Sequence, residues 1–107
     1  MGLSKSHAFS ENQNRLASLA KAIGHPARIA IIETLIKKNA CVCGELVDEL
    51  PLSQATISQH LKELKSAGLI KGTIEGPSIC YCIDEEAWLQ TQQLLENFFN
   101  QYSNSCC

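Results

Sequence analysis

The side chains best suited to chemistry in this 107-residue chain are its six cysteines, which fall into three close pairs. The pairs are Cys41 and Cys43, Cys80 and Cys82, and Cys106 and Cys107. The chain begins with no apolar run long enough for a signal peptide, and no later run approaches a membrane span. We therefore expect a cytoplasmic protein, with no membrane partner, whose thiols stay reduced. Cysteines in that compartment favour metal or redox chemistry over disulfides, and soft metals prefer thiolates.

The spacing of Cys41 and Cys43 restricts the backbone between them. On a regular helix, residues two apart point about 200° away from each other, whereas in an extended segment they share a face. Joint binding of one metal by both thiolates therefore requires that this segment not be regular helix. A metal bound here is expected to re-angle the entry to the short helix that follows, Glu45–Leu50.

The elements that position these thiols follow from hydrophobic spacing and from helix-ending residues. The pattern predicts a mainly α-helical domain with one small β-hairpin, and it places N-caps at Ser53 and Asp84. Helices are expected at about 11–23, 26–36, 45–50, 53–66 and 84–102, with strands at 69–74 and 79–83. The whole chain, 1–107, is expected to be one domain, with a frayed start at 1–10 and a flexible cysteine-containing tail at 103–107.

The third and fourth predicted helices are separated by a turn tight enough for a helix–turn–helix, and the hairpin that follows would be its wing. Projected at about 100° per residue, the fourth helix buries Ile57, Leu61 and Leu64 and turns small polar side chains outward. Glutamine, serine and threonine suit base edges in the major groove, and lysines suit phosphates. We expect contacts with double-stranded DNA from Ser53, Gln54, Thr56, Ser58, Gln59, His60, Lys62, Lys65 and Lys71.

His60 lies on the flank of that outward face. The alternative for a flanking histidine is burial in the core with its hydrogen bonds satisfied.

The formal net charge of −2 does not exclude DNA, because charge acts locally and is screened within about 10 Å at ordinary salt. Residues 1–40 carry six basic and two acidic side chains, and residues 53–74 carry three lysines and one glutamate. The acidic excess lies instead at 41–52 and 75–107. The charge distribution is therefore compatible with one positive face.

The last predicted helix has an aromatic side that is too large to leave in water on so small a domain. Together with the first helix, this side is expected to form the interface of a homodimer. Its members are Trp88, Leu95, Phe98, Phe99 and Tyr102.

With the helix–turn–helix and wing in place, four motifs make the chain resemble the ArsR/SmtB family of metal-responsive repressors, from about Leu16 to Trp88. The motifs are Gly-His-Pro-Ala-Arg at 24–28, Cys-Val-Cys at 41–43, Ser-Gln-Ala-Thr-Ile-Ser-Gln-His-Leu at 53–61, and Ala-Gly-Leu-Ile at 67–70. The resemblance implies a homodimeric winged-helix repressor that leaves its operator when a toxic metal or metalloid binds. In the arsenic branch, the two cysteines of the Cys-x-Cys box bind As(III) or Sb(III). The box of this chain is Cys41-Val42-Cys43.

Two departures from the family pattern concern the ligands. The arsenic branch often has a third cysteine at the position of Leu46, and the zinc branch uses histidines on the last helix, where Asp84–Tyr102 has none. An arsenical normally takes three thiolates. We expect the third from Cys106 or Cys107, of the same or the partner subunit. Cys80 and Cys82 are the rival source, and we expect them on an exposed face of the wing.

Alternatives to an arsenic-responsive repressor remain at this point. One is a repressor for Cd(II), Pb(II) or Zn(II), with four thiolates from the box and the tail. Another is a repressor controlled by thiol oxidation or persulfide formation. An enzyme is not expected, because the histidines at 7, 25 and 60 lack catalytic partners. A winged helix that only binds other proteins would show no protection of promoter DNA.

Overall fold

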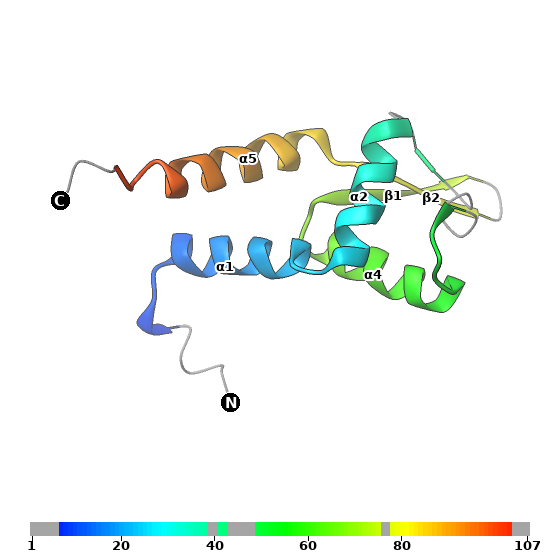
Figure 1. Ribbon diagram of the computed structural model, residues 1–107, viewed down its shortest axis with the longest axis horizontal. Helices are drawn as coiled ribbons and strands as arrows, with labels where there is room; N and C mark the ends of the chain where they lie inside the picture. The colour runs from blue at the N-terminus through cyan, green and yellow to red at the C-terminus, as the bar shows by residue number, and fades with distance from the viewer. Residues whose placement is uncertain (1–6, 39–40, 43–48, 76–77, 104–107) are drawn as a thin grey trace.

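The computed structural model describes residues 7–38, 41–42, 49–75 and 78–103, and this part is mainly helical with one antiparallel hairpin (Figure 1). Its elements are α1 (Glu11–Ile23), α2 (Pro26–Lys38), α4 (Gln54–Ser66), β1 (Ile70–Glu75), β2 (Ser78–Ile83) and α5 (Glu85–Phe99). The described residues thus contain four helices, whereas the sequence predicts five. The remaining predicted helix, Glu45–Leu50, falls mostly at 43–48, outside the described residues.

The two predicted N-caps are confirmed. The side chain of Ser53 accepts a hydrogen bond from the amide of Thr56 at 3.2 Å, and the carboxylate of Asp84 accepts one from the amide of Ala87 at 3.2 Å. Each bond satisfies one of the amides that a helix start leaves without an intrahelical partner. These caps fix where α4 and α5 begin.

The exit from α4 depends on Gly68. Its φ of 86° lies in the left-handed region, which glycine adopts without the cost that a Cβ imposes. The amide of Gly68 donates to the carbonyl of Lys65 at 2.9 Å, and the amide of Leu69 donates to that of Leu64 at 3.1 Å. The chain thereby turns directly from α4 into the hairpin.

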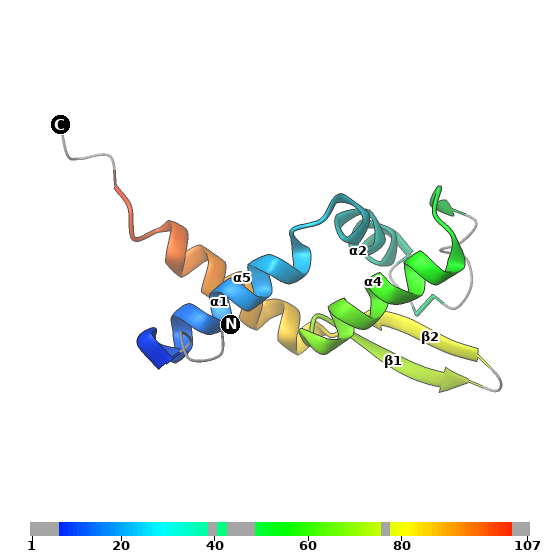
Figure 2. The same cartoon turned by 90° about the horizontal axis from the view of Figure 1, so that it is seen from below.

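The hydrophobic core lies where α1, α2, α4 and the hairpin meet. α4 packs against α2 and β1, and Figure 2 shows it between α2 and the hairpin. The predicted inner face of α4 is confirmed, since Ile57, Leu61 and Leu64 are all buried. Burying one such side chain contributes roughly 1.5–3 kcal/mol, so this face holds α4 in place. The core also includes Leu19, Ala22, Ile31, Ile32, Leu35, Val42, Leu69 and Ile70.

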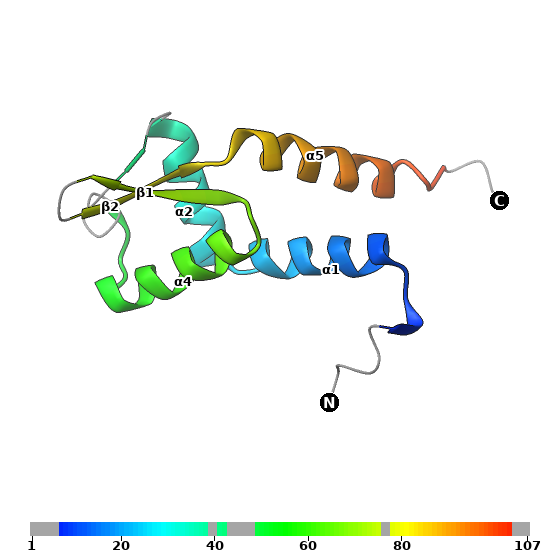
Figure 3. The same cartoon turned by 180° about the vertical axis from the view of Figure 1, so that it is seen from behind.

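α1 and α5 contact each other and extend together away from this core (Figures 1 and 3). The described part is accordingly elongated, with extents of 54 × 34 × 26 Å. The start of α1 and the end of α5 lie on the same side of the molecule.

The hairpin is extended by a third segment from elsewhere in the chain. β1 and β2 pair in antiparallel register, with Lys71 opposite Cys82. On the other edge of β2, Val42 forms an antiparallel bridge with Tyr81. The amide of Val42 donates to the carbonyl of Tyr81 at 2.7 Å, and the amide of Tyr81 donates to that of Val42 at 2.9 Å. The backbone at Val42 is therefore extended, as shared binding by the box cysteines requires.

Candidate DNA-binding helix and thiol site

The outward face of α4 presents the polar side chains that the sequence assigns to DNA. Eight of the nine predicted contacts are exposed, and only His60 is not. Two internal bonds order this face: the hydroxyl of Ser53 donates to that of Thr56 at 3.0 Å, and the Gln59 amide donates to the Glu63 carboxylate at 3.3 Å. The exposed members are Ser53, Gln54, Thr56, Ser58, Gln59, Lys62, Lys65 and, on β1, Lys71.

His60 instead lies in the core, with 9% of its surface exposed. Its Nδ1 accepts a hydrogen bond from Arg28 Nε at 3.1 Å, and its ring centroid is 4.5 Å from that of His25. Burial lowers the pKa of His60 below the ordinary 6.5, and the charges of His25 and Arg28 lower it further, against an opposing effect of Glu63. The neutral ring, with its proton on Nε2, is therefore favoured. Such a histidine positions α4 and is poorly placed to contact a base.

Arg28 is the residue that sequence reasoning missed. Besides His60, its guanidinium donates to the carbonyl of Ala22 at 3.1 Å and to that of Lys21 at 3.4 Å. It thus joins the end of α1 to the inner side of α4. Arg28 belongs to the motif Gly-His-Pro-Ala-Arg (24–28), but a local motif does not identify a hydrogen-bond partner 32 positions away.

Cys41 and Cys82 form a disulfide, with their Cα atoms 4.3 Å apart. Cys41 is exposed and Cys82 is half-buried. The expectation that the thiols stay unpaired is therefore wrong for these two residues.

The expectation that Cys80 and Cys82 are exposed on the wing is also wrong. Cys80 is only 1% exposed and is likewise held in the disulfide-bonded state. The segment at Val42 pairs with Tyr81 along the edge of β2, so this edge faces another part of the chain. The wing cysteines thus belong to the junction between the hairpin and the box.

The predicted metal ligands are only partly placed. Cys43, Cys106 and Cys107 lie outside the described residues. Within the part that is described, no group of three or more histidine, cysteine, aspartate or glutamate side chains is arranged to hold a metal ion. What the structure brings together is one box cysteine, Cys41, and one wing cysteine, Cys82.

A pocket of about 490 Å³ adjoins this pair. Its walls are mostly apolar, and Lys71 and Glu85 provide charge at its edge. The sulfur chemistry of such a site fits a soft metal ion or metalloid, provided that the cysteines are reduced. The lining residues are Leu35, Ile36, Cys41, Lys71, Cys82, Ile83, Glu85, Trp88 and Leu89.

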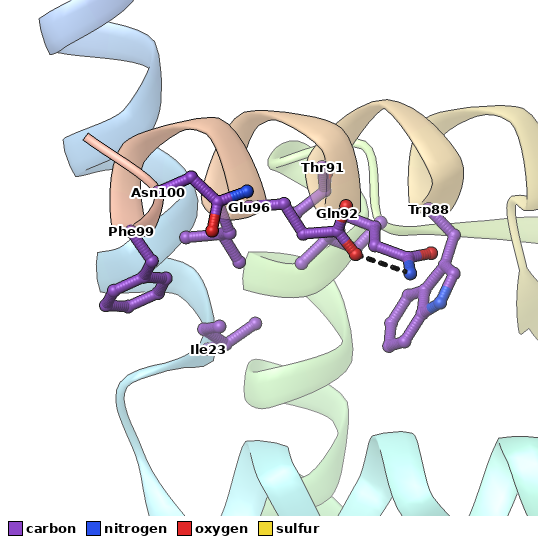
Figure 4. A pocket seen from close by; sticks show the side chains of 9 residues that line it. Ile23, Trp88, Thr91, Gln92, Glu96, Phe99 and Asn100 are labelled. Carbon is purple, nitrogen blue, oxygen red and sulfur yellow. Dashed lines mark hydrogen bonds between the residues drawn. The ribbon is translucent and has the colours of Figure 1, made fainter. Parts of the chain in front are cut away.

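A second pocket, of about 480 Å³, lies along α5 where it faces α1 (Figure 4). Its wall includes Ile23, Trp88 and Phe99, and Gln92 donates a hydrogen bond to Glu96 at 3.1 Å on the same helix. The hydroxyl of Thr91 is buried and has no hydrogen-bond partner among the described residues. The pocket therefore continues the aromatic side of α5 that the sequence predicts to be a dimer interface.

No helix in the described part of the chain has both the length and the apolar character needed to cross a membrane.

A core-anchored helix with an exposed polar face, followed at once by a two-stranded wing, defines a winged-helix DNA-binding regulator. The sequence model for bacterial regulatory proteins of the arsR family matches residues 25–71, which include α4 and the box. The chain belongs to this family. It is a DNA-binding regulator of transcription and not an enzyme.

Individual relatives agree with this assignment. The chain is 39% identical over 77 residues to an uncharacterized HTH-type transcriptional regulator of Methanocaldococcus jannaschii, a match covering 70% of this chain and 85% of that protein. It is 44% identical over 63 residues to the HTH-type transcriptional repressor SmtB of Mycobacterium tuberculosis, covering 59% of this chain and 46% of the repressor. A crystal structure described as a possible transcriptional regulator for arsenical resistance superposes with a TM-score of 0.66 at 26% identity, covering 74% of this chain and 81% of that one.

Proposed function

We propose that this protein is a homodimeric transcriptional repressor that leaves its operator when As(III) or Sb(III) binds to thiolates of the Cys41-Val42-Cys43 box. The single observation that carries the proposal is the pairing of Val42 with Tyr81. That pairing ties the box directly to the wing, which follows the DNA-reading helix without a linker. A change at the box therefore acts on the DNA-binding surface.

α4 and the wing would bind the operator in the cytoplasm. The exposed Gln54, Ser58 and Gln59 would reach base edges in the major groove, where glutamine pairs with adenine and serine serves several bases. Lys62 and Lys65 on α4 and Lys71 on β1 would contact phosphates. His60 is left out of this set, because its ring is buried against Arg28.

A homodimer through α1 and α5 would present two copies of α4 to successive turns of the major groove, about 34–36 Å apart. The support for this interface is the exposure of large aromatic side chains at the end of α5. Phe98 is 49% exposed, and Phe99 is 67% exposed. A monomer rarely leaves such a cluster in water.

The inducer would bind thiolates built around Cys41 and Cys43. The backbone at Val42 is extended, as joint binding requires, and a trivalent arsenical forms stable bonds to thiolates. The relative described as a possible regulator for arsenical resistance supports this metalloid by similarity. The sequence alone leaves the third thiolate open between the tail cysteines, Cys106 and Cys107, and the wing pair.

A Cd(II)-, Pb(II)- or Zn(II)-responsive repressor remains an alternative and would use four thiolates. A second candidate has a specific observation in its favour, the Cys41–Cys82 disulfide. It is a repressor that responds to thiol oxidation, in which closing this bond rather than binding a metal alters the wing.

The test begins with a selection of genomic DNA fragments by the purified, reduced protein, followed by footprinting to define the operator. Fluorescence anisotropy then follows release of the operator during separate titrations with arsenite, Cd(II), Zn(II) and, in the presence of a chelator, hydrogen peroxide. We expect arsenite to release the wild-type protein. We expect Cys41→Ser/Cys43→Ser to bind the operator normally and to ignore arsenite.

A full arsenite response in the double variant would place the site elsewhere. Release by peroxide alone, with no release by any metal, would favour the oxidation-responsive candidate.

A further inference from the structure

Cys82 is placed opposite Cys41 by the backbone of the hairpin, across a sequence separation of 41 residues. Val42 and Tyr81 exchange both of their amide–carbonyl bonds, which makes them a hydrogen-bonded antiparallel pair. The next pair in such a ladder is non-hydrogen-bonded, and its Cα atoms are about 4.5 Å apart. The Cα atoms of Cys41 and Cys82, 4.3 Å apart, fit that position. Their proximity thus follows from strand pairing and does not depend on the bond between their sulfurs.

The surroundings of this pair suit a soft ligand once the bond is reduced. Cys41 is exposed, so a solute can reach it, while Cys82 is half-buried beside the apolar wall formed by Leu35 and Trp88. Lys71 pairs with Cys82 in the hairpin register and lines the same pocket. Cysteine binds metals as the thiolate.

We propose that Cys82 supplies a thiolate to the inducer site, so that the bound metalloid bridges the box and the wing without help from the C-terminal tail. This inference rests on the proposed function, which already assigns the thiolates of the box to the inducer. The ligand class is a soft trivalent metalloid or a thiophilic divalent cation. A bridge of this kind acts on β2 directly, and β2 is half of the wing.

The chemistry of binding is an exchange without electron transfer. Arsenous acid, As(OH)₃, reacts with three thiols to form three As–S bonds and three waters, with each hydroxide leaving with one thiol proton. The disulfide seen between Cys41 and Cys82 must first accept two electrons and two protons from a dithiol or phosphine reductant. The oxidised pair therefore cannot bind the metalloid.

Mass spectrometry can detect the bridge directly. Phenylarsine oxide joins two thiols through one arsenic and releases one water, and trypsin cuts after Lys38, Lys62 and Lys71, which separates Cys41 from Cys82. The Cys106→Ser/Cys107→Ser variant, whose tail has no thiol to contribute, is reduced with a phosphine and then treated with phenylarsine oxide. We expect a phenylarsenic bridge between peptides 39–62 and 72–107, and its loss when Cys82→Ser is added. Bridges confined to single peptides, or a bridge that survives Cys82→Ser, would overturn the proposal.

Arsenite titration of the reduced protein supplies a second measurement that needs no DNA, read by thiolate-to-arsenic absorption. We expect Cys82→Ser to weaken binding by at least about tenfold, since even the loss of an outer-shell partner costs a metal site 10–100-fold. Cys106→Ser/Cys107→Ser should bind like the wild type. Cys82→Ala is measured alongside, and circular dichroism shows that each variant is folded.

The outcomes separate this inference from the proposed function. No arsenite binding by any protein, including the wild type, refutes the proposed function. Wild-type binding that survives Cys82→Ser and Cys82→Ala but is lost in the tail variant refutes the role of Cys82 and leaves the repressor intact.

Discussion

Arg28 connects three parts of the chain through one side chain. Its guanidinium donates to His60 within α4 and to the carbonyls of Lys21 and Ala22 at the end of α1. Hydrogen bonds from a charged group contribute about 1.5–3 kcal/mol each when they are well made. The orientation of α4 therefore depends on a partly buried polar contact as well as on apolar packing.

The stability of the protein should fall as the pH drops below about 6.5, the ordinary pKa of histidine. The pKa of His60 is lower in the folded protein, so the unfolded chain takes up this proton first, and acid favours unfolding. The stability contributed by the neutral ring is complete above the ordinary pKa and is lost as the pH falls through the lowered one. Urea unfolding at several pH values measures this slope.

The matched variants for that measurement are His60→Gln and His7→Gln. The first should flatten the slope below pH 6.5, and the second, at an exposed histidine outside the core, should leave it unchanged. An equal slope in wild type and His60→Gln would show that another group controls the acid response.

At the scale of elements, local signals predicted most of the fold. Ser53, Asp84 and Gly68 act on their own helices, so the sequence around each is sufficient to place a helix end. The contacts that define the candidate site are of another kind. Val42 pairs with Tyr81, and Arg28 pairs with His60. Both pairs join residues far apart in the sequence, which local sequence patterns cannot predict. His60 is buried where it accepts a hydrogen bond from Arg28, a partner on another helix, which explains why its exposure was mispredicted.

Gly68→Ala should lower the free energy of unfolding by about 1 kcal/mol through backbone conformation alone. A Cβ added at Gly68 meets nothing within 4 Å, so crowding plays no part. Gly68→Asn is the control, because asparagine tolerates the left-handed region, and it should lose less. Chemical denaturation compares the three proteins. Equal losses in the two variants would contradict a cost that depends on φ.

Lys62→Ala should weaken operator binding to all sequences alike and reduce the salt slope of the binding constant by about 1, because a phosphate contact is lost. Gln59→Ala should instead weaken binding to the preferred sequence only. Lys37→Ala, on the exposed end of α2, is the charge-matched control and should leave the slope unchanged. Anisotropy titrations at several salt concentrations distinguish these results. An unaltered slope in Lys62→Ala would remove this lysine from the DNA contacts.

At the scale of the whole molecule, the elongated shape places the aromatic end of α5 and the polar face of α4 at opposite ends. α1 and α5 extend together on one side, and α4 and the hairpin lie on the other (Figures 1 and 2). The aromatic side chains at the end of α5 are therefore far along the long axis from the wing. A second copy of the chain can cover them without hiding the polar face of α4.

Phe98→Ser/Phe99→Ser should shift the protein toward monomer and weaken operator binding, because one copy reads only one half-site. Sedimentation velocity measures the oligomeric state. Ile29→Ser removes an exposed apolar side chain from α2 and should leave the oligomeric state unchanged. A dimer of unaltered stability in the double variant would place the interface elsewhere.

The bridge at Val42 also has a consequence for solubility. An unpaired strand edge offers amides and carbonyls to any other extended chain and is a starting point for aggregation. The edge of β2 at Tyr81 is occupied by Val42, so its amide is already hydrogen-bonded and should exchange slowly with deuterium. Any change that separated Val42 from Tyr81 would uncover that edge. The same contact that links the box to the wing therefore also protects the sheet from pairing with another chain.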